Sequence, residues 1–158
     1  MMLCWAAAAD TPHRLEPAPN PSPPSFVLDR LDGDAVDLAH LRGSAVLVHF
    51  FATWCEPCKA EFATLAQFAA RRPDIKILAI NVAEPAARVR SFATAERISL
   101  PILLDADRKV TRAWHVSVLP TTFVLDATHT PRLFVEGDLD WSLDDTLSAI
   151  DAATAPKP

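Results

Sequence analysis

The feature that most constrains the fold is a pair of cysteines, Cys55 and Cys58, at the junction of a strand-like run and a helix-like run. Residues 45–52 (AVLVHFFA) are apolar apart from His49 and rich in β-branched and aromatic side chains. This pattern is typical of a strand that is covered on both faces. Residues 58–69 then repeat apolar side chains at helical spacing. The sequence therefore predicts both sulfur atoms where a buried strand passes into a helix.

That position favours redox chemistry. Unpaired N–H groups and the positive end of a helix dipole lower the pKa of a thiol, so we predict Cys55 to be the nucleophile. Cys58 lies one turn later on the same side of the helix, where it can attack a mixed disulfide formed by Cys55. Pro57 is tolerated there because a first-turn residue has no N–H bond to lose. The alternative is an inert pair.

Composition narrows the class of protein. The chain has 158 residues and a net charge of −5, which suits one domain and excludes the basic surface that nucleic acid requires. Cys4, Cys55 and Cys58 are its three cysteines, an odd number that argues against a disulfide scaffold. Structural zinc normally needs four ligands, and His49 is the only histidine expected near the pair. We expect no metal and no cofactor.

A resemblance follows from three segments. The stretch VLVHFFATWCEPCKAEF, residues 46–62, resembles the TlpA/ResA-like branch of extracytoplasmic thiol–disulfide oxidoreductases, which have the thioredoxin fold. Residues 119–123 (LPTTF) resemble the cis-proline loop and the following strand of that family, and residues 26–41 resemble its N-terminal hairpin. The resemblance covers roughly residues 25–150. It implies an α/β thioredoxin-like fold, with a mixed central sheet flanked by helices and an extra N-terminal β-hairpin.

The pattern of the chain agrees with that architecture. Strand and helix patterns alternate after the cysteines, which implies parallel strands joined by crossovers. The expected strands are residues 26–29, 35–38, 45–52, 75–82, 101–105, 121–126 and 132–135. The expected helices after the active-site helix are residues 84–97, 107–115 and 143–153, the second capped by Asp105 or Asp107 and the third by Ser142 or Asp144.

The resemblance also implies substrate-binding residues. Pro120 is expected to follow a cis peptide bond and to lie across from Cys55. The backbone of Leu119 would then be free to pair with an extended substrate segment, with Thr121 next to it. Trp54 is expected to shield the disulfide partly and to contact a partner. Core packing is the alternative for Trp54.

Two more residues are candidates for proton transfer. Glu61 lies three residues after Cys58, on the same side of the helix, and the family carries a glutamate at this offset. We expect it to shuttle protons or tune the thiols; the alternative is a solvated acid favoured by the helix dipole. His49 departs from the family, in which thioredoxin has a buried aspartate and this branch commonly an asparagine. It is either a proton acceptor or donor for Cys58 or a polar core residue only. Trp141 and the turn 137–140 are assigned no catalytic role.

The domain organisation is expected in three parts. Residues 1–24 read as a leader, interpreted as the remnant of a secretory signal, and a tether that contains six of the 14 prolines. The tether offers no means of burying apolar surface. Residues 25–154 form the thioredoxin-like domain, and residues 155–158 a disordered tail. A periplasmic or otherwise extracytoplasmic location is predicted, with a cytoplasmic one as the alternative and membrane association left open.

The predicted function is reduction of disulfides in exported partner proteins by a monomer, with an upstream thiol reductant. Cytochrome c maturation is one candidate role. A thiol-dependent peroxidase is an alternative, although Thr53 precedes Cys55 without the Pro-x-x-x-Thr context of peroxiredoxins. A non-catalytic redox-sensing or binding module is another.

Overall fold

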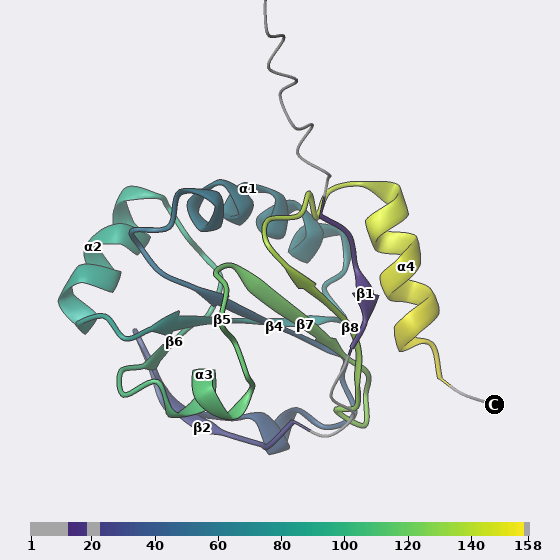
Figure 1. Ribbon diagram of the computed structural model, residues 1–158, viewed down its shortest axis with the longest axis horizontal. Coiled ribbons are helices and arrows are strands. Elements are labelled where there is room, and N and C mark those ends of the chain that lie inside the picture. The colour runs from purple at the N-terminus through teal and green to yellow at the C-terminus, as the bar shows by residue number, and fades with distance from the viewer. Residues whose placement is uncertain (1–12, 19–22, 157–158) are drawn as a thin grey trace, which may run out of the picture.

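A computed structural model of the chain describes residues 13–18 and 23–156, which form an eight-stranded mixed sheet with helices on both faces (Figure 1). The strand order is β1-β8-β7-β4-β5-β6-β2-β3. The strands are β1 (Glu16–Pro17), β2 (Val27–Arg30), β3 (Val36–Asp37), β4 (Val46–Phe51), β5 (Lys76–Val82), β6 (Ile102–Asp105), β7 (Thr121–Leu125) and β8 (Pro131–Glu136). The helices are η1 (Leu38–Leu41, a 3-10 helix), α1 (Glu56–Arg71), α2 (Ala86–Ala95), α3 (Lys109–Ala113) and α4 (Asp144–Thr154). Within the described ranges, no helix is long and apolar enough to cross a bilayer.

The centre of the sheet is parallel and its flanks are antiparallel. β4, β5 and β6 run parallel and are connected through α1 and α2, whereas β7 lies antiparallel to β4 and β8 antiparallel to β7. Parallel neighbours need a crossover, and the helices supply it. The predicted mixed α/β architecture is confirmed.

β4 divides the core into two halves because its side chains alternate between the faces of the sheet. Leu47 and Phe51 pack in a cluster with α1 and α4, whereas Val48 and Phe50 pack in a second cluster with α3 and β2. Figure 1 shows α1 and α2 on one side of the sheet and α3 on the other. The prediction of a strand covered on both faces is confirmed, and it places His49 on the α1 side.

The predicted N-terminal hairpin is present. β2 and β3 pair antiparallel, with Val27 opposite Asp37. β2 also pairs antiparallel with β6, so the hairpin extends the central sheet at its edge. The hairpin thus belongs to the same sheet as the cysteine-bearing strand.

The residues predicted as caps of α3 accept hydrogen bonds from its first turn, although the N-cap residue of that helix is Arg108, and the caps predicted for α4 are wrong. At α3, Asp105 accepts hydrogen bonds from the N–H groups of Val110 and Thr111, and Asp107 accepts one from Lys109 N–H. α4 has no side-chain cap at its N-cap residue, Leu143. Ser142 donates to Asp140 instead, and Asp144 lies inside the first turn.

The segment before the hairpin differs from the expected tether. β1 pairs antiparallel with β8, and Ala18 N–H donates to the Arg132 carbonyl at 3.1 Å. Leu15 packs against the core, so this segment does bury apolar surface. Proline-rich backbone is already extended, and few donors are needed to pair an edge strand. Cys4 and most of the expected leader lie outside the described residues, and the three-part domain division stays a prediction.

Candidate active site

Cys55 occupies the N-cap position of α1, directly after the loop that leaves β4. Its Sγ accepts a hydrogen bond from Cys58 N–H at 3.3 Å, and the two cysteines form a disulfide with Cα atoms 5.3 Å apart. Cys58 is fully buried and Cys55 is 5% exposed. The predicted junction of strand, cysteine pair and helix is confirmed. The pair is poised for exchange with one sulfur nearer the surface than the other.

Trp54 lies beside the pair with its side chain in solvent. It is 68% exposed, which makes the core-packing alternative wrong. Tryptophan is enriched at protein–protein interfaces, where its large side chain supplies much of the contact area. Trp54 is therefore free to contact a partner at Cys55.

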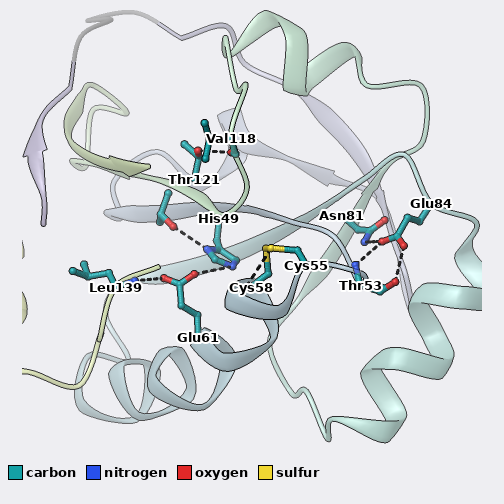
Figure 2. Close-up of a disulfide and its surroundings, with 11 residues drawn as sticks. His49, Thr53, Cys55, Cys58, Glu61, Asn81, Glu84, Val118, Thr121 and Leu139 are labelled. Carbon is teal, nitrogen blue, oxygen red and sulfur yellow. Dashed lines mark hydrogen bonds and ion pairs between the residues drawn. A yellow bond between two sulfur atoms is a disulfide. The ribbon is translucent and has the colours of Figure 1, made fainter. Parts of the chain in front are cut away.

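The loop before β7 supplies the second wall of the site. The Leu119-Pro120 peptide bond is cis. Thr121 pairs with Phe50 in the sheet, so the proline lies next to the end of β4, from which the loop to Cys55 departs. The Thr121 hydroxyl is buried and donates to the Val118 carbonyl at 2.7 Å (Figure 2). The Thr121 side chain thus holds the loop and does not face a partner.

Glu61 is buried, which makes the solvated-acid alternative wrong. Its Oε1 accepts hydrogen bonds from Leu139 N–H at 2.9 Å and from the Trp141 indole N–H at 2.7 Å. Burial raises the pKa of Glu61 to about 7, although these two hydrogen bonds act to lower it; the nearby charge of Asp138 raises it further. At this pKa the carboxyl can exchange a proton near neutral pH.

His49 lies opposite Glu61 and is fully buried. Its Nδ1 is 2.8 Å from Thr122 Oγ1, and its Nε2 is 4.0 Å from Glu61 Oε2. The ring stacks on Phe51 and contacts the Phe62 ring edge-on. Burial lowers the pKa of His49 to about 3. Figure 2 shows the His49 and Glu61 side chains pointing toward each other beside the disulfide.

The loop after β8 holds Glu61, a contact that the sequence did not predict. Leu139 and Trp141, to which the sequence assigned no catalytic role, both donate to the carboxylate and so orient a candidate proton carrier. A buried tryptophan usually finds an acceptor for its N–H, and Trp141 is fully buried. That tendency was a signal, but sequence alone does not identify the acceptor.

A second missed group holds the loop before Cys55. Glu84, after β5, accepts hydrogen bonds from the Thr53 N–H at 2.8 Å, the Thr53 hydroxyl at 2.6 Å and the Asn81 amide at 2.7 Å. Thr53 lies two residues before Cys55 (Figure 2). Three donors on one carboxylate fix the path of the loop that presents the cysteine.

Comparisons with known proteins agree with this arrangement. The AhpC/TSA family model matches residues 19–132. The thiol–disulfide oxidoreductase ResA of Bacillus subtilis (strain 168) is 40% identical over 105 residues, 65% of this chain and 59% of that protein. ResA of Geobacillus kaustophilus (strain HTA426) is 34% identical over 118 residues, 73% of this chain and 68% of that protein. The chain therefore spans less than two thirds of the length of the Bacillus subtilis relative and slightly more than two thirds of the length of the Geobacillus kaustophilus relative.

A solved structure of a disulfide oxidoreductase has a similar fold. It is a secreted Mycobacterium tuberculosis disulfide oxidoreductase homologous to E. coli DsbE, 28% identical, with a TM-score of 0.69. The alignment covers 81% of this chain and 95% of that one. With the cysteine pair at the start of α1 and the cis-proline loop beside it, the chain belongs to the AhpC/TSA family and, within it, to the ResA-like thioredoxin-fold thiol–disulfide oxidoreductases.

Proposed function

We propose that this protein reduces disulfides in exported partner proteins through reversible oxidation of Cys55 and Cys58. The observation that carries the proposal is the Cys55–Cys58 disulfide at the N-cap of α1, with exposed Trp54 beside it. A thiolate at a helix start is stabilised by the unpaired N–H groups there.

The exchange has two steps. The Cys55 thiolate attacks the partner disulfide, forms a mixed disulfide and displaces the first partner thiolate. Cys58 then loses its proton and attacks Cys55 Sγ, which releases the second partner thiolate. Two electrons pass to the partner, and the protein ends in the disulfide form that the structure shows.

Apocytochrome c is the candidate partner class. The haem-attachment motif Cys-x-x-Cys-His must present free thiols before haem is bound, and its oxidised form is a substrate for a dithiol reductase. The match to thiol–disulfide oxidoreductases supports action on such a disulfide, and the secreted relative supports an extracytoplasmic location. An upstream thiol reductant would return the protein to its dithiol form.

Insulin reduction tests the activity. The protein with a thiol donor should reduce insulin, Cys55→Ser should lose this activity, and Cys58→Ser should accumulate mixed disulfides with partners. A peptide with an oxidised Cys-x-x-Cys-His motif tests the partner class against the same peptide with Ala for His. Inactivity on every protein disulfide, together with consumption of peroxide, would favour the peroxidase alternative.

A further inference from the structure

Two buried polar atoms face each other beside the cysteine pair, and neither has a hydrogen-bond partner among the described residues. They are His49 Nε2 and Glu61 Oε2, 4.0 Å apart. Burial of a polar group without a hydrogen-bond partner is unfavourable, so two such groups at one place call for an explanation. The separation is too long for a hydrogen bond but short enough for a small movement to make one.

The hydrogen bonds of Glu61 decide which of its oxygens takes a proton. Oε1 accepts from two N–H groups, those of Leu139 and Trp141, so a proton on Oε1 would oppose both donors. Oε2 has no such donor and faces His49. The acidic proton of Glu61 therefore belongs on Oε2.

The hydrogen bond of His49 has a matching consequence. Its Nδ1 lies 2.8 Å from the Thr122 hydroxyl. When Nδ1–H donates to that hydroxyl, Nε2 carries a lone pair and faces the Glu61 proton. The proton on Oε2 can then be donated to Nε2 as a hydrogen bond, and in this state the pair carries no net charge.

We propose that His49 and Glu61 act as one acid–base pair that takes the proton of the Cys58 thiol when Cys58 attacks the mixed disulfide. This inference rests on the proposed reductase function and assigns its second step to a pair of residues. The S–H bond of Cys58 breaks, its proton passes to the pair, the sulfur–sulfur bond to Cys55 forms, and the bond from Cys55 to the partner breaks. The partner leaves as a thiolate and takes its own proton from water.

The surroundings allow this role. Cys58 is fully buried, so water does not reach its sulfur, and Glu61 lies three residues later on the same side of α1. The groups packed on His49 from β4, β7 and α1 are Phe51, Thr122 and Phe62, none of which titrates in this range.

Burial and a nearby charge both act on the pair. Burial of the carboxyl raises the pKa of Glu61, and the charge of Asp138, in the loop after β8, raises it further. Burial also disfavours the imidazolium form of His49. Both effects favour the neutral pair with one proton over two separate ions.

The two steps can be timed separately with 5,5′-dithiobis(2-nitrobenzoate). Attack by Cys55 on this disulfide releases one coloured thiolate, and attack by Cys58 on the resulting mixed disulfide releases the second. Stopped-flow absorbance on the reduced protein, from pH 5 to pH 9, gives a rate for each phase. The first phase tests the proposed function, and the second tests the pair.

The rate of the second phase should rise with pH, because the pair can accept the Cys58 proton only after Glu61 has lost its own proton. His49→Asn should move the midpoint of this phase to lower pH, because protonated Glu61 loses the imidazole that accepts its hydrogen bond. The high-pH rate should fall by about tenfold, because the carboxylate is then a weaker base toward Cys58. Glu61→Gln should lower the rate by about 100-fold. The double variant should be no slower than Glu61→Gln, because the two residues act as a unit. His40→Asn, an exposed histidine in η1, is the matched control and should leave both phases unchanged.

Three results would overturn the inference while leaving the proposed function intact. They are a second phase with an unchanged midpoint and rate in His49→Asn, fully additive effects in the double variant, and a ¹⁵N spectrum of the oxidised protein that places the His49 proton on Nε2 at every pH. The spectrum needs no substitution, so it decides the matter even where a variant fails to fold. No first phase in the unmodified protein would instead overturn the reductase function.

Discussion

The Glu84 carboxylate accepts hydrogen bonds from both the backbone N–H and the hydroxyl of Thr53, at 2.8 and 2.6 Å. These bonds tie the end of the strand next to β4 to the loop that presents Cys55. Glu84 is buried, and the Thr53 hydroxyl is the only donor to its Oε1 among the described residues, so the loss of that hydroxyl leaves Oε1 without a partner.

We expect Thr53→Ala to lower the free energy of unfolding by about 1–2 kcal/mol, because it removes a charge-assisted hydrogen bond and leaves Glu84 Oε1 unsatisfied. Urea unfolding of the oxidised protein measures the change. Ser91→Ala, which removes a hydrogen bond on the exposed face of α2, is the control and should have little effect. Equal stability of the two variants would contradict a role for Glu84 in holding the loop.

Glu61 should make stability depend on pH in an unusual direction. Its folded-state pKa of about 7 lies above the ordinary value of 4.5, so the folded protein binds this proton more tightly than the unfolded chain. The stabilisation is present below pH 4.5 and is lost as the pH rises to about 7. His49 acts oppositely: its lowered pKa of about 3 makes stability fall as the pH drops from 6.5 to 3.

Glu61→Gln removes the first effect. Between pH 4.5 and pH 8, the free energy of unfolding of the variant should increase relative to that of the unmodified protein by up to about 3 kcal/mol. The reason is that the variant has no carboxylate to ionise in the core. Urea unfolding at pH 4.5, 6 and 8 measures the difference. Glu16→Gln, on the exposed surface of β1, controls for loss of a surface carboxylate. A constant difference between Glu61→Gln and the unmodified protein would show that Glu61 ionises as readily in the fold as outside it.

Trp54 should matter for partners and little for folding. Trp54→Ala should change the free energy of unfolding by less than about 0.5 kcal/mol, because the side chain is mostly in solvent. It should lower kcat/KM for insulin by about tenfold, since buried aromatic contacts dominate interfaces, and affect a small aromatic disulfide less. Val27→Ala is the control, because Val27 is an apolar residue of similar exposure on β2, next to the edge strand β3. A similar loss with both substrates would assign Trp54 to the chemistry of Cys55 and not to partner contact.

Trp141 should set the proton affinity of Glu61. Trp141→Phe removes one of the two N–H groups that favour the carboxylate, so the pKa of Glu61 should rise, and stability should fall by about 1–3 kcal/mol. The free energy of unfolding falls as the pH rises, and the pH at which this fall ends reports the pKa of Glu61 in the folded protein. Trp114→Phe removes an indole hydrogen bond to the Pro24 carbonyl, away from Glu61, and should leave that pH unchanged. If the fall in the free energy of unfolding ended at the same pH in Trp141→Phe as in the unmodified protein, Leu139 alone would hold the carboxylate.

The sequence was sufficient to predict the strands and helices that depend on a local pattern of residues. The apolar run through His49, the cysteine spacing and the helical repeat after Cys58 predicted β4, α1 and their junction, because periodicity and length directly reflect burial. The cis bond before Pro120 came from the resemblance, since proline alone only rarely implies it.

What could not be predicted depends on contacts between distant residues. Glu61 meets Leu139 and Trp141 across some 80 positions, and Thr53 meets Glu84 across 31. Neither pairing has a local pattern, so the sequence left a solvated Glu61 open as an alternative and did not indicate the partners of its carboxylate. The same reason explains β1: its partner strand, β8, lies near the other end of the chain.

The alternating side chains of β4 limit where evolution can change the chemistry of this protein. If the sequence of β4 were displaced by one residue, the histidine would point into the cluster around α3. Val48 or Phe50 would then lie opposite Glu61. Of the same-facing positions, residue 49 is the one opposite Thr122. Exchange of the amino acid at that single position is thus a route by which relatives with one backbone could acquire different proton acceptors, whereas insertion or deletion of one residue in the strand would abolish the acceptor altogether.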